Sequence, residues 1–175
     1  MNKFHIDLER IIKVALDELY RKDIYLITHE PTDLSNGGDA HVSERGIVAR
    51  FLIYLERLRL KNCHLKGYNL DVEYNRNLDE PKYLPGTIWK NNGAFPDMVL
   101  HIRGNNDGNI LIVEFKTHWN KGREGIISDI VKLQAFLRDP YFYENALFVM
   151  LNRDSPKLFW IKEDSDVEEI VRSVQ

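Results

Sequence analysis

Two charged residues end an otherwise apolar segment of the chain, the run Ile110–Thr117. If this run is a β-strand, alternate side chains point to opposite faces, so Glu114 and Lys116 share a face that begins with isoleucines. Their positions along the strand are then roughly 7 Å apart. A carboxylate and an ammonium at that separation can contact opposite sides of one assembly of phosphate and metal ion. Taken alone, the pair also fits a salt bridge at an exposed strand end.

A third charge, Asp97, opens the preceding expected strand, Asp97–Arg103. The turn Gly104–Asn109 contains an Asp-Gly pair, which is typical of a β-hairpin. A simple tight hairpin places Asp97 opposite Lys116, and a register shifted by two residues still brings Asp97, Glu114 and Lys116 to one face. Alone, Asp97 also fits the turn at a strand entry.

The fourth charge, Glu44, heads the apolar stripe of an expected helix over 42–61. The other members of this stripe, at helical spacing, are Ile47, Val48, Phe51, Leu55 and Leu58. Burying an acid is costly unless it has a partner, and a divalent cation shared with Asp97 and Glu114 is such a partner. A first-turn acid that complements the helix dipole is the plainer alternative.

These residues resemble the PD-(D/E)XK nuclease superfamily, which includes restriction endonucleases, repair nucleases and Holliday-junction resolvases. The motif stands here as Pro96-Asp97, then sixteen residues, then Glu114-Phe115-Lys116, and Glu44 matches the acid on the family's first core helix. The resemblance implies that Glu44, Asp97 and Glu114 bind one or two Mg²⁺ ions, with Mn²⁺ as an alternative. It also implies that Lys116 orients the attacking water or stabilises charge on the phosphorane. Metal-bound water is more acidic, and the metal neutralises developing charge.

The order of expected elements agrees with a restriction-endonuclease-like core. Hydrophobic periodicity and turn residues predict a fold of the α/β class, with a central mixed sheet flanked by helices, in the order αβββαβ between about 42 and 162. A further helix over 6–22 is expected to pack on this core, so that 1–175 form one domain. The remaining expected elements are a short piece at 24–28, a loop at 30–40, strands at 68–74, 97–103, 110–117, 146–151 and 157–162, a loop at 75–95, and helices at 126–137 and 166–174.

Several residues near the motif are candidates for holding a nucleic-acid backbone or stacking a base. A basic and aromatic loop follows the expected site directly, although an ordinary surface loop fits equally well. Two polar residues on the next helix are further candidates, with a solvated helix face as the favoured alternative. Some family members carry Gln and Tyr, or Lys, on this helix, but Phe136 and Arg138 stand where the tyrosine is wanted. These candidates are His118, Trp119, Lys121, Arg123, Lys132 and Gln134.

Composition narrows the functional classes only modestly. The chain has 175 residues, 43% hydrophobic and 29% charged, with a formal net charge of -3. That charge neither supports nor excludes a polyanionic substrate. Cys63 is the only cysteine, the first residues carry acids without a long apolar run, and no apolar stretch approaches the roughly 20 residues of a membrane span. We therefore expect a cytoplasmic protein without a membrane partner.

The sequence thus predicts a Mg²⁺-dependent nuclease that hydrolyses phosphodiester bonds, with DNA favoured over RNA as its partner. The pattern leaves open endo- or exonuclease action, and it is compatible with a homodimer or a larger complex. One alternative is a catalytically inactive module of the same fold that binds nucleic acid or a partner protein. Another is a hydrolase of a different phosphoester.

Overall fold

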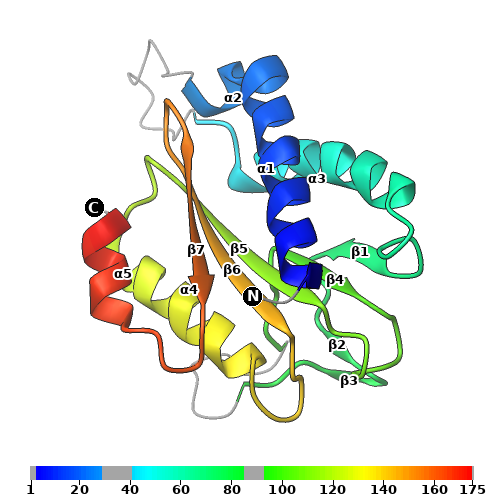
Figure 1. Ribbon diagram of the computed structural model, residues 1–175. Coiled ribbons are helices and arrows are strands. Elements are labelled where there is room, and N and C mark those ends of the chain that lie inside the picture. Colours follow the sequence, from blue (N-terminus) through cyan, green and yellow to red (C-terminus); the bar gives the residue numbers. More distant parts are fainter. Residues whose placement is uncertain (1–2, 29–40, 85–92, 175) are drawn as a thin grey trace.

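The computed structural model describes residues 3–28, 41–84 and 93–174, and contains a mixed β-sheet with helices on both of its faces (Figure 1). In chain order the elements are α1 (Lys3–Asp23), α2 (Tyr25–Thr28), α3 (Glu44–Lys61), β1 (Asn69–Val72), β2 (Arg76–Asn77), β3 (Glu80–Pro81), β4 (Met98–His101), β5 (Leu111–Thr117), α4 (Arg123–Phe136), β6 (Asn145–Leu151), β7 (Pro156–Ile161) and α5 (Val167–Val174). The predicted α/β class, with a mixed sheet flanked by helices, is confirmed.

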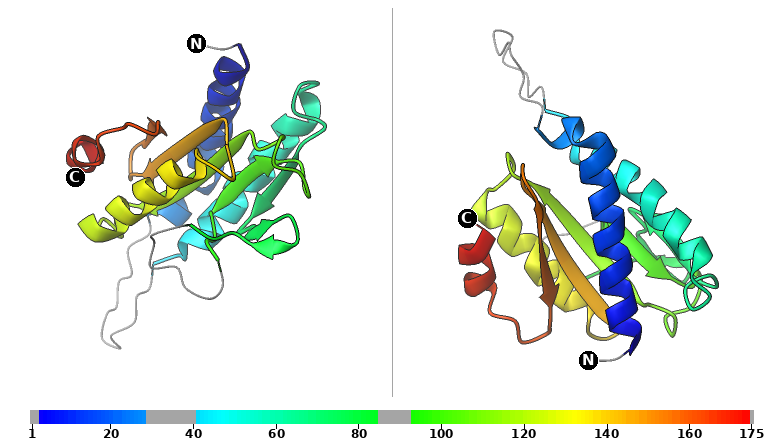
Figure 2. Two further views of the ribbon diagram at one scale, coloured as in Figure 1. Left: turned by 90° about the horizontal axis from the view of Figure 1, so that it is seen from below. Right: turned by 45° about the horizontal axis from the view of Figure 1, so that its top comes forward.

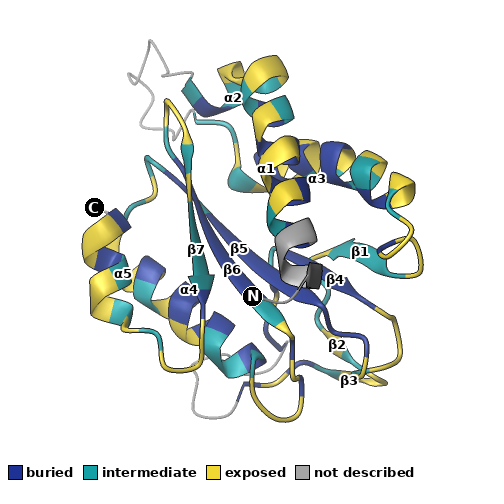
Figure 3. Cartoon of the chain, viewed as in Figure 1, coloured by how far each residue is buried: buried dark blue, intermediate teal, exposed yellow. Residues whose placement is uncertain are grey.

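The main sheet has five strands in the order β1-β4-β5-β6-β7. Only the pairing of β5 with β6 is parallel, and its crossover is α4; the other three pairings are antiparallel. Strands β5 and β6 therefore lie at the centre, and almost all their side chains are buried (Figure 3). This explains why their sequences are apolar on both faces.

Each face of the sheet has its own hydrophobic core. Leu111, Val113 and Phe115 of β5 pack with residues of α1 and α3 on one face, whereas Ile112 packs with residues of α4 and α5 on the other. Figure 2 shows α1 and α3 on one side of the sheet and α4 and α5 on the opposite side. The predicted division of this strand into two faces is confirmed from Leu111 onward, so Glu114 and Lys116 belong to the face that α4 covers. Ile110, which was predicted to share that face, precedes β5 and packs in the core with α1 and α3 instead.

Helix α3 begins where the sequence favours a helix start. The side chain of Ser43 accepts a hydrogen bond from the backbone N–H of Gly46, which satisfies one of the unpaired donors of the first turn. The buried side of the helix carries Ile47, Val48 and Phe51, and the ring of Phe51 meets that of Phe115 at 5.2 Å between centroids. This packing fixes the first turn of α3, and with it Glu44, over the end of β5.

Most predicted elements are present with modest changes in their limits. The short piece after α1 is a helical turn, α2, and the expected loop over 75–95 contains the two-stranded β2-β3 hairpin. The predicted loop over 30–40 lies outside the described residues, as does part of the 75–95 segment. None of the described helices is long and apolar enough to cross a membrane.

The chain returns to β4 through a segment held close to Lys82. Gly93 has a φ of 79°, and a Cβ at this position would lie 2.7 Å from the carbonyl oxygen of Lys82. The next amide, that of Ala94, donates to the same carbonyl at 2.6 Å. Only glycine fits both the backbone conformation and the close approach, and this contact sets the path that leads to Asp97.

Candidate functional site at the end of β5

The last residues of β5 carry two of the four predicted site residues toward α4. Glu114 is buried, with 2% of its surface exposed, and Lys116 lies two positions further along the strand. Both side chains form ion pairs with residues of α4. The alternative of a salt bridge between Glu114 and Lys116 on an exposed strand end is therefore wrong.

Asp97 joins the site, although in a register different from the simplest prediction. Met98 pairs with Val113, so Asp97 continues the ladder toward Glu114 and not toward Lys116. The predicted pairing of Asp97 with Lys116 is wrong, whereas the alternative register two residues away is the one observed. The turn is longer than a tight hairpin because β4 ends at His101 and β5 begins only at Leu111.

The carboxylate of Asp97 accepts a backbone hydrogen bond of β5 that a carbonyl group of β4 would accept if the pairing of the two strands continued. The backbone N–H of Phe115 donates to Oδ2 of Asp97 at 2.7 Å, just beyond the point where the pairing of β4 with β5 stops. Asp97 is therefore held by the strand that carries the other charged groups.

Glu44 reaches the same strand from the other layer. Its Oε2 accepts a hydrogen bond from the backbone N–H of Thr117 at 3.0 Å. The amides of Phe115 and Thr117 are alternate amides of β5, so both point to the side on which β4 has ended. Carboxylates from two separate segments thus complete the hydrogen bonding of one strand end, and the site exists because the ladder is short.

Helix α4 supplies two further charged residues, Asp129 and Lys132, which are 6% and 5% exposed. Lys116 Nζ lies 2.7 Å from Asp129 Oδ2, and Lys132 Nζ lies 2.6 Å from Glu114 Oε2. Lys132 Nζ also lies 3.5 Å from Asp129 Oδ1. These contacts form one chain of alternating charge that runs from Glu114 through Lys132 and Asp129 to Lys116.

This arrangement corrects the interpretation of α4. The preference for a solvated face at Lys132 is wrong, because its ammonium is buried against Glu114. Asp129 was not among the predicted site residues. Its signal was nevertheless present, because Asp129 falls in the apolar stripe of Ile126, Ile130 and Leu133 at the same spacing that singled out Glu44.

Burial controls the protonation of the carboxyl groups. It raises the pKa of Glu44 and of Asp97, and raises that of Glu114 well above its ordinary value. For Glu114 the nearby ammonium of Lys132 acts in the opposite direction but does not outweigh burial. Burial also works against the charged form of Lys116, yet Asp129 prevails and the pKa of Lys116 is raised.

The donor set suits a hard divalent cation in its chemistry. With all groups ionised, four carboxylates (Glu44, Asp97, Glu114, Asp129) and two ammonium groups (Lys116, Lys132) leave an excess of two negative charges. Oε1 of Glu114 is buried and has no hydrogen-bond partner among the described residues, which is costly without a cation or a water. In the described parts of the chain, however, no three acidic, His or Cys side chains are arranged so that they could hold a metal ion. The carboxylates point instead to backbone amides and lysines.

A surface groove opens over two of the site residues. Its volume is about 590 Å³, and its walls come from Ser43, Glu44, Arg45, Glu73, Phe95 and Asp97. Arg45 and Glu73 form an ion pair across it at 2.6 Å. Glu44 and Asp97 thus lie between solvent and the buried pair of Glu114 and Lys132.

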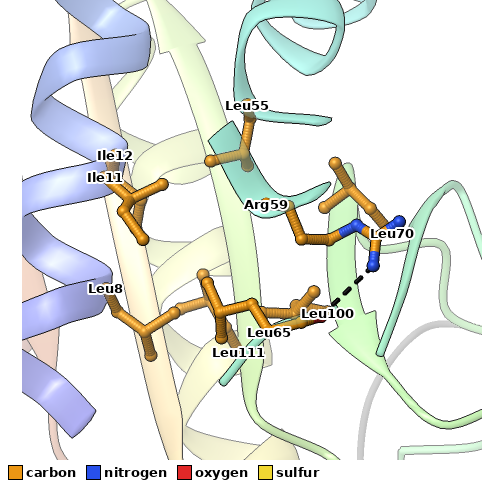
Figure 4. Close-up of a pocket in the computed structure, with 9 residues that line it drawn as sticks. All are labelled: Leu8, Ile11, Ile12, Leu55, Arg59, Leu65, Leu70, Leu100 and Leu111. Atoms are coloured by element: carbon orange, nitrogen blue, oxygen red, sulfur yellow. Dashed lines mark hydrogen bonds between the residues drawn. The ribbon is translucent and has the colours of Figure 1, made fainter. Parts of the chain in front are cut away.

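A second cavity, between α1, α3 and the sheet, has a different character (Figure 4). It is lined mainly by leucines and isoleucines and has a volume of only about 10 Å³. Arg59 closes one side by donating to the carbonyl oxygen of Leu65 at 3.2 Å. This is a packing gap with no room for a substrate.

The remaining nucleic-acid candidates contact groups outside the cluster of carboxylates and lysines. His118 Nε2 contacts the carbonyl oxygen of Ile27 at 2.9 Å, and the ring of Trp119 stacks on that of His41 at 4.5 Å. Arg123 pairs with Glu168 of α5. Gln134 donates to backbone carbonyls of the loop after β7, including that of Ser165 at 2.9 Å, and therefore ties α4 to this loop. Lys121 is half-buried, and no contact within the described part of the chain places it in the site.

Comparisons with known proteins found no match to this chain among family models, curated proteins or solved structures.

Proposed function

We propose that this protein is a metal-dependent nuclease that hydrolyses phosphodiester bonds, with DNA favoured over RNA. The proposal is carried by one observation. Glu44, Asp97 and the pair of Glu114 and Lys116, which come from three separate segments of the sequence, lie around the last four residues of β5.

The order of elements supports a restriction-endonuclease-like core. Helix α3, strands β1, β4 and β5, helix α4 and strand β6 follow the αβββαβ order that the resemblance implies. The small β2-β3 hairpin is an insertion between the first and second strands of this order. The remaining elements, α1, α2, β7 and α5, are additions around it.

The residues divide into three chemical roles. Glu44, Asp97 and Glu114 would hold Mg²⁺ or Mn²⁺, which when bound acidifies water and offsets the negative charge that develops on the phosphate. Lys116 would place a positive charge beside the reacting phosphate and orient the attacking water. Asp129 holds the Lys116 ammonium at 2.7 Å and is a positioning residue.

The direct test is cleavage of plasmid, linear and branched DNA, and of RNA, with Mg²⁺ or Mn²⁺. Asp97→Ala and Lys116→Ala should each lower the cleavage rate by about a hundredfold or more, as expected for the loss of a group that stabilises transition-state charge. Lys157→Ala removes the same charge as Lys116→Ala from an exposed position on β7 and should cleave like the wild type. Equal activity in all four proteins would rule out the assigned site.

A non-catalytic module that binds nucleic acid or a partner protein is the second candidate. It is favoured by the pairing of the site carboxylates with amides and lysines. Calorimetry with Mn²⁺ separates the two candidates. A nuclease should bind Mn²⁺ and lose this binding in Glu114→Ala, whereas an inactive module should show no heat of Mn²⁺ binding in either protein.

A further inference from the structure

The contact of Lys132 with Glu114 raises the question of what this lysine does in a metal site. Its ammonium lies 2.6 Å from Glu114 Oε2, and both side chains are almost completely buried. A buried ion pair of this kind gains little net stability, because desolvation of both charges offsets their attraction. A bound divalent cation would need the same carboxylate that Lys132 now occupies.

Asp129 offers Lys132 a second partner within short reach. The Lys132 ammonium already lies 3.5 Å from Asp129 Oδ1, so a small rotation of a flexible side chain would bring it to full hydrogen-bond distance. The two residues are three positions apart on α4 and therefore lie side by side on one helix face. Lys116 occupies the other oxygen of the same carboxylate.

We propose that Lys132 stands in for the cation in the metal-free site, and that binding of a divalent cation moves its ammonium from Glu114 to Asp129. This inference rests on the proposed function, because it requires a metal at Glu114. It assigns to α4 a positioning role: Lys132 keeps Glu114 paired in the absence of metal, and Asp129 receives Lys132 when the metal enters.

The transfer also accounts for the unpartnered oxygen of Glu114. Lys132 satisfies Oε2 and leaves Oε1 buried, with no hydrogen bond from any residue of segments 3–28, 41–84 and 93–174. A lysine therefore replaces a divalent cation incompletely, both in charge and in the number of oxygens it contacts. The site is neutralised enough to fold, yet it retains a preference for the metal.

The test is calorimetric titration of the metal-free protein with Mn²⁺ alone, so it does not depend on cleavage. Lys132→Met removes the ammonium and keeps the length of the side chain. It should bind Mn²⁺ about tenfold or more tightly than the wild type, because the competing ion pair is gone. Lys116→Met removes an equal charge that does not contact Glu114 and should tighten binding by a smaller factor. Lys157→Met, on β7, should leave the affinity unchanged.

Asp129→Asn gives the opposite expectation, since it removes the carboxylate that is proposed to receive the Lys132 ammonium, which should then remain at Glu114. Its Mn²⁺ affinity should fall, and the double variant Lys132→Met with Asp129→Asn should recover the affinity toward that of Lys132→Met. Circular dichroism identifies any variant that fails to fold, in which case Lys132→Gln replaces Lys132→Met.

The outcomes separate the two proposals. If the wild type binds no Mn²⁺ and no variant does, the proposed metal-dependent function fails. If the wild type binds Mn²⁺ but Lys132→Met binds equally or more weakly, the role of Lys132 as a stand-in for the cation is overturned while the proposed function survives.

Discussion

Lys82 is a buried amine surrounded by aromatic rings, at a distance from the candidate site. Its Nζ donates to the hydroxyl of Tyr143 at 2.7 Å and lies 5.1 Å from the ring centroids of both Tyr74 and Tyr143. Burial lowers the pKa of Lys82 to about 7, against an ordinary value of 10.5. The rings attract the charged form, but removal of the ammonium from water prevails.

This lysine should make the folding stability depend on pH. Between pH 7 and 10.5 the unfolded chain binds a proton at Lys82 that the folded chain does not, so the free energy of unfolding should rise with pH through this interval. Lys82→Met should remove this rise. The variant's free energy of unfolding should exceed that of the wild type by the largest amount below pH 7, where the wild type must bury a charged ammonium. Urea unfolding at pH 6, 8 and 10 measures the effect, and exposed Lys157→Met is the control. A wild type and a Lys82→Met variant with parallel pH profiles would contradict the prediction.

The sequence identifies which residues belong to the candidate site more readily than it identifies the side chains that they contact. Glu44, Asp97, Glu114 and Lys116 were predictable because charge stood where apolar residues were expected. The same argument applied to α4 would have found Asp129, which lies in an apolar stripe. The identity of its partner was not predictable, because whether Lys132 turns toward solvent or toward Glu114 depends on how α4 docks on the sheet.

Among the elements, α3 and β5 determine the geometry of the site. Helix α3 carries Glu44 in its first turn, and that turn is fixed by the Ser43 cap and by the packing of Phe51 on Phe115. Strand β5 carries Glu114 and Lys116 and offers the two amides that hold Glu44 and Asp97. The position of these charges is therefore set by backbone groups and core packing, which do not move independently.

The Ser43 cap provides a test of this coupling between the helix end and the site. Ser43→Ala should lower the free energy of unfolding by about 1 kcal/mol, the usual cost of losing a helix cap. Because the first turn would then fray, Mn²⁺ affinity should also fall, although Ser43 is expected to contribute no metal ligand. Thermal unfolding and Mn²⁺ calorimetry measure the two effects. Ser173→Ala, which removes a side-chain hydrogen bond at the end of α5, should alter stability without altering Mn²⁺ affinity.

The elements themselves were largely predictable, and their exact pairing was not. Periodicity gave α1, α3, α4 and the central strands, because each buries a regular stripe or alternates faces. The register of β4 with β5 depended on the length of the turn between them, and that turn is not the tight one its Asp-Gly pair suggested. The β2-β3 hairpin was missed because two-residue strands leave no periodic signal.

In the molecule as a whole, the site is a cluster of ionisable groups at the end of β5, to which α3 contributes from one face of the sheet and α4 from the other. The pKa values of Glu44, Asp97 and Glu114 are raised mainly by burial, so the folded protein binds more protons at these groups than the unfolded chain does as the pH increases above about 4.5. The free energy of unfolding contributed by these groups is therefore greatest at low pH and is lost as the pH rises through their folded pKa values.

A divalent cation should reverse this trend, because it favours the ionised carboxylates. At a Mg²⁺ concentration about a hundred times the dissociation constant, the free energy of unfolding should increase by about 2.7 kcal/mol. This gain should be large at pH 7.5 and small at pH 5, where protons compete with the metal. Thermal unfolding with and without Mg²⁺ at both pH values measures it, and Ca²⁺ and Na⁺ at matched ionic strength serve as comparisons. An equal gain at both pH values would show that the cation does not bind at these carboxyl groups.

The early end of the β4 ladder implies a conflict between the stability of the fold and the proposed activity. Replacing Asp97 with a β-branched, uncharged residue such as valine would remove a buried acid and favour an extended backbone opposite Glu114. The amide of Phe115 would lose its carboxylate partner, and Pro96, which faces Phe115 in this register, has no N–H to donate in return. Such a chain would bury one acid fewer at this end of the sheet and would keep only Glu44 and Glu114 of the three proposed cation ligands. Selection for thermal stability alone would therefore favour loss of the acid at position 97. Selection for the proposed metal-dependent activity would have to retain Asp97 at the unpaired end of β5.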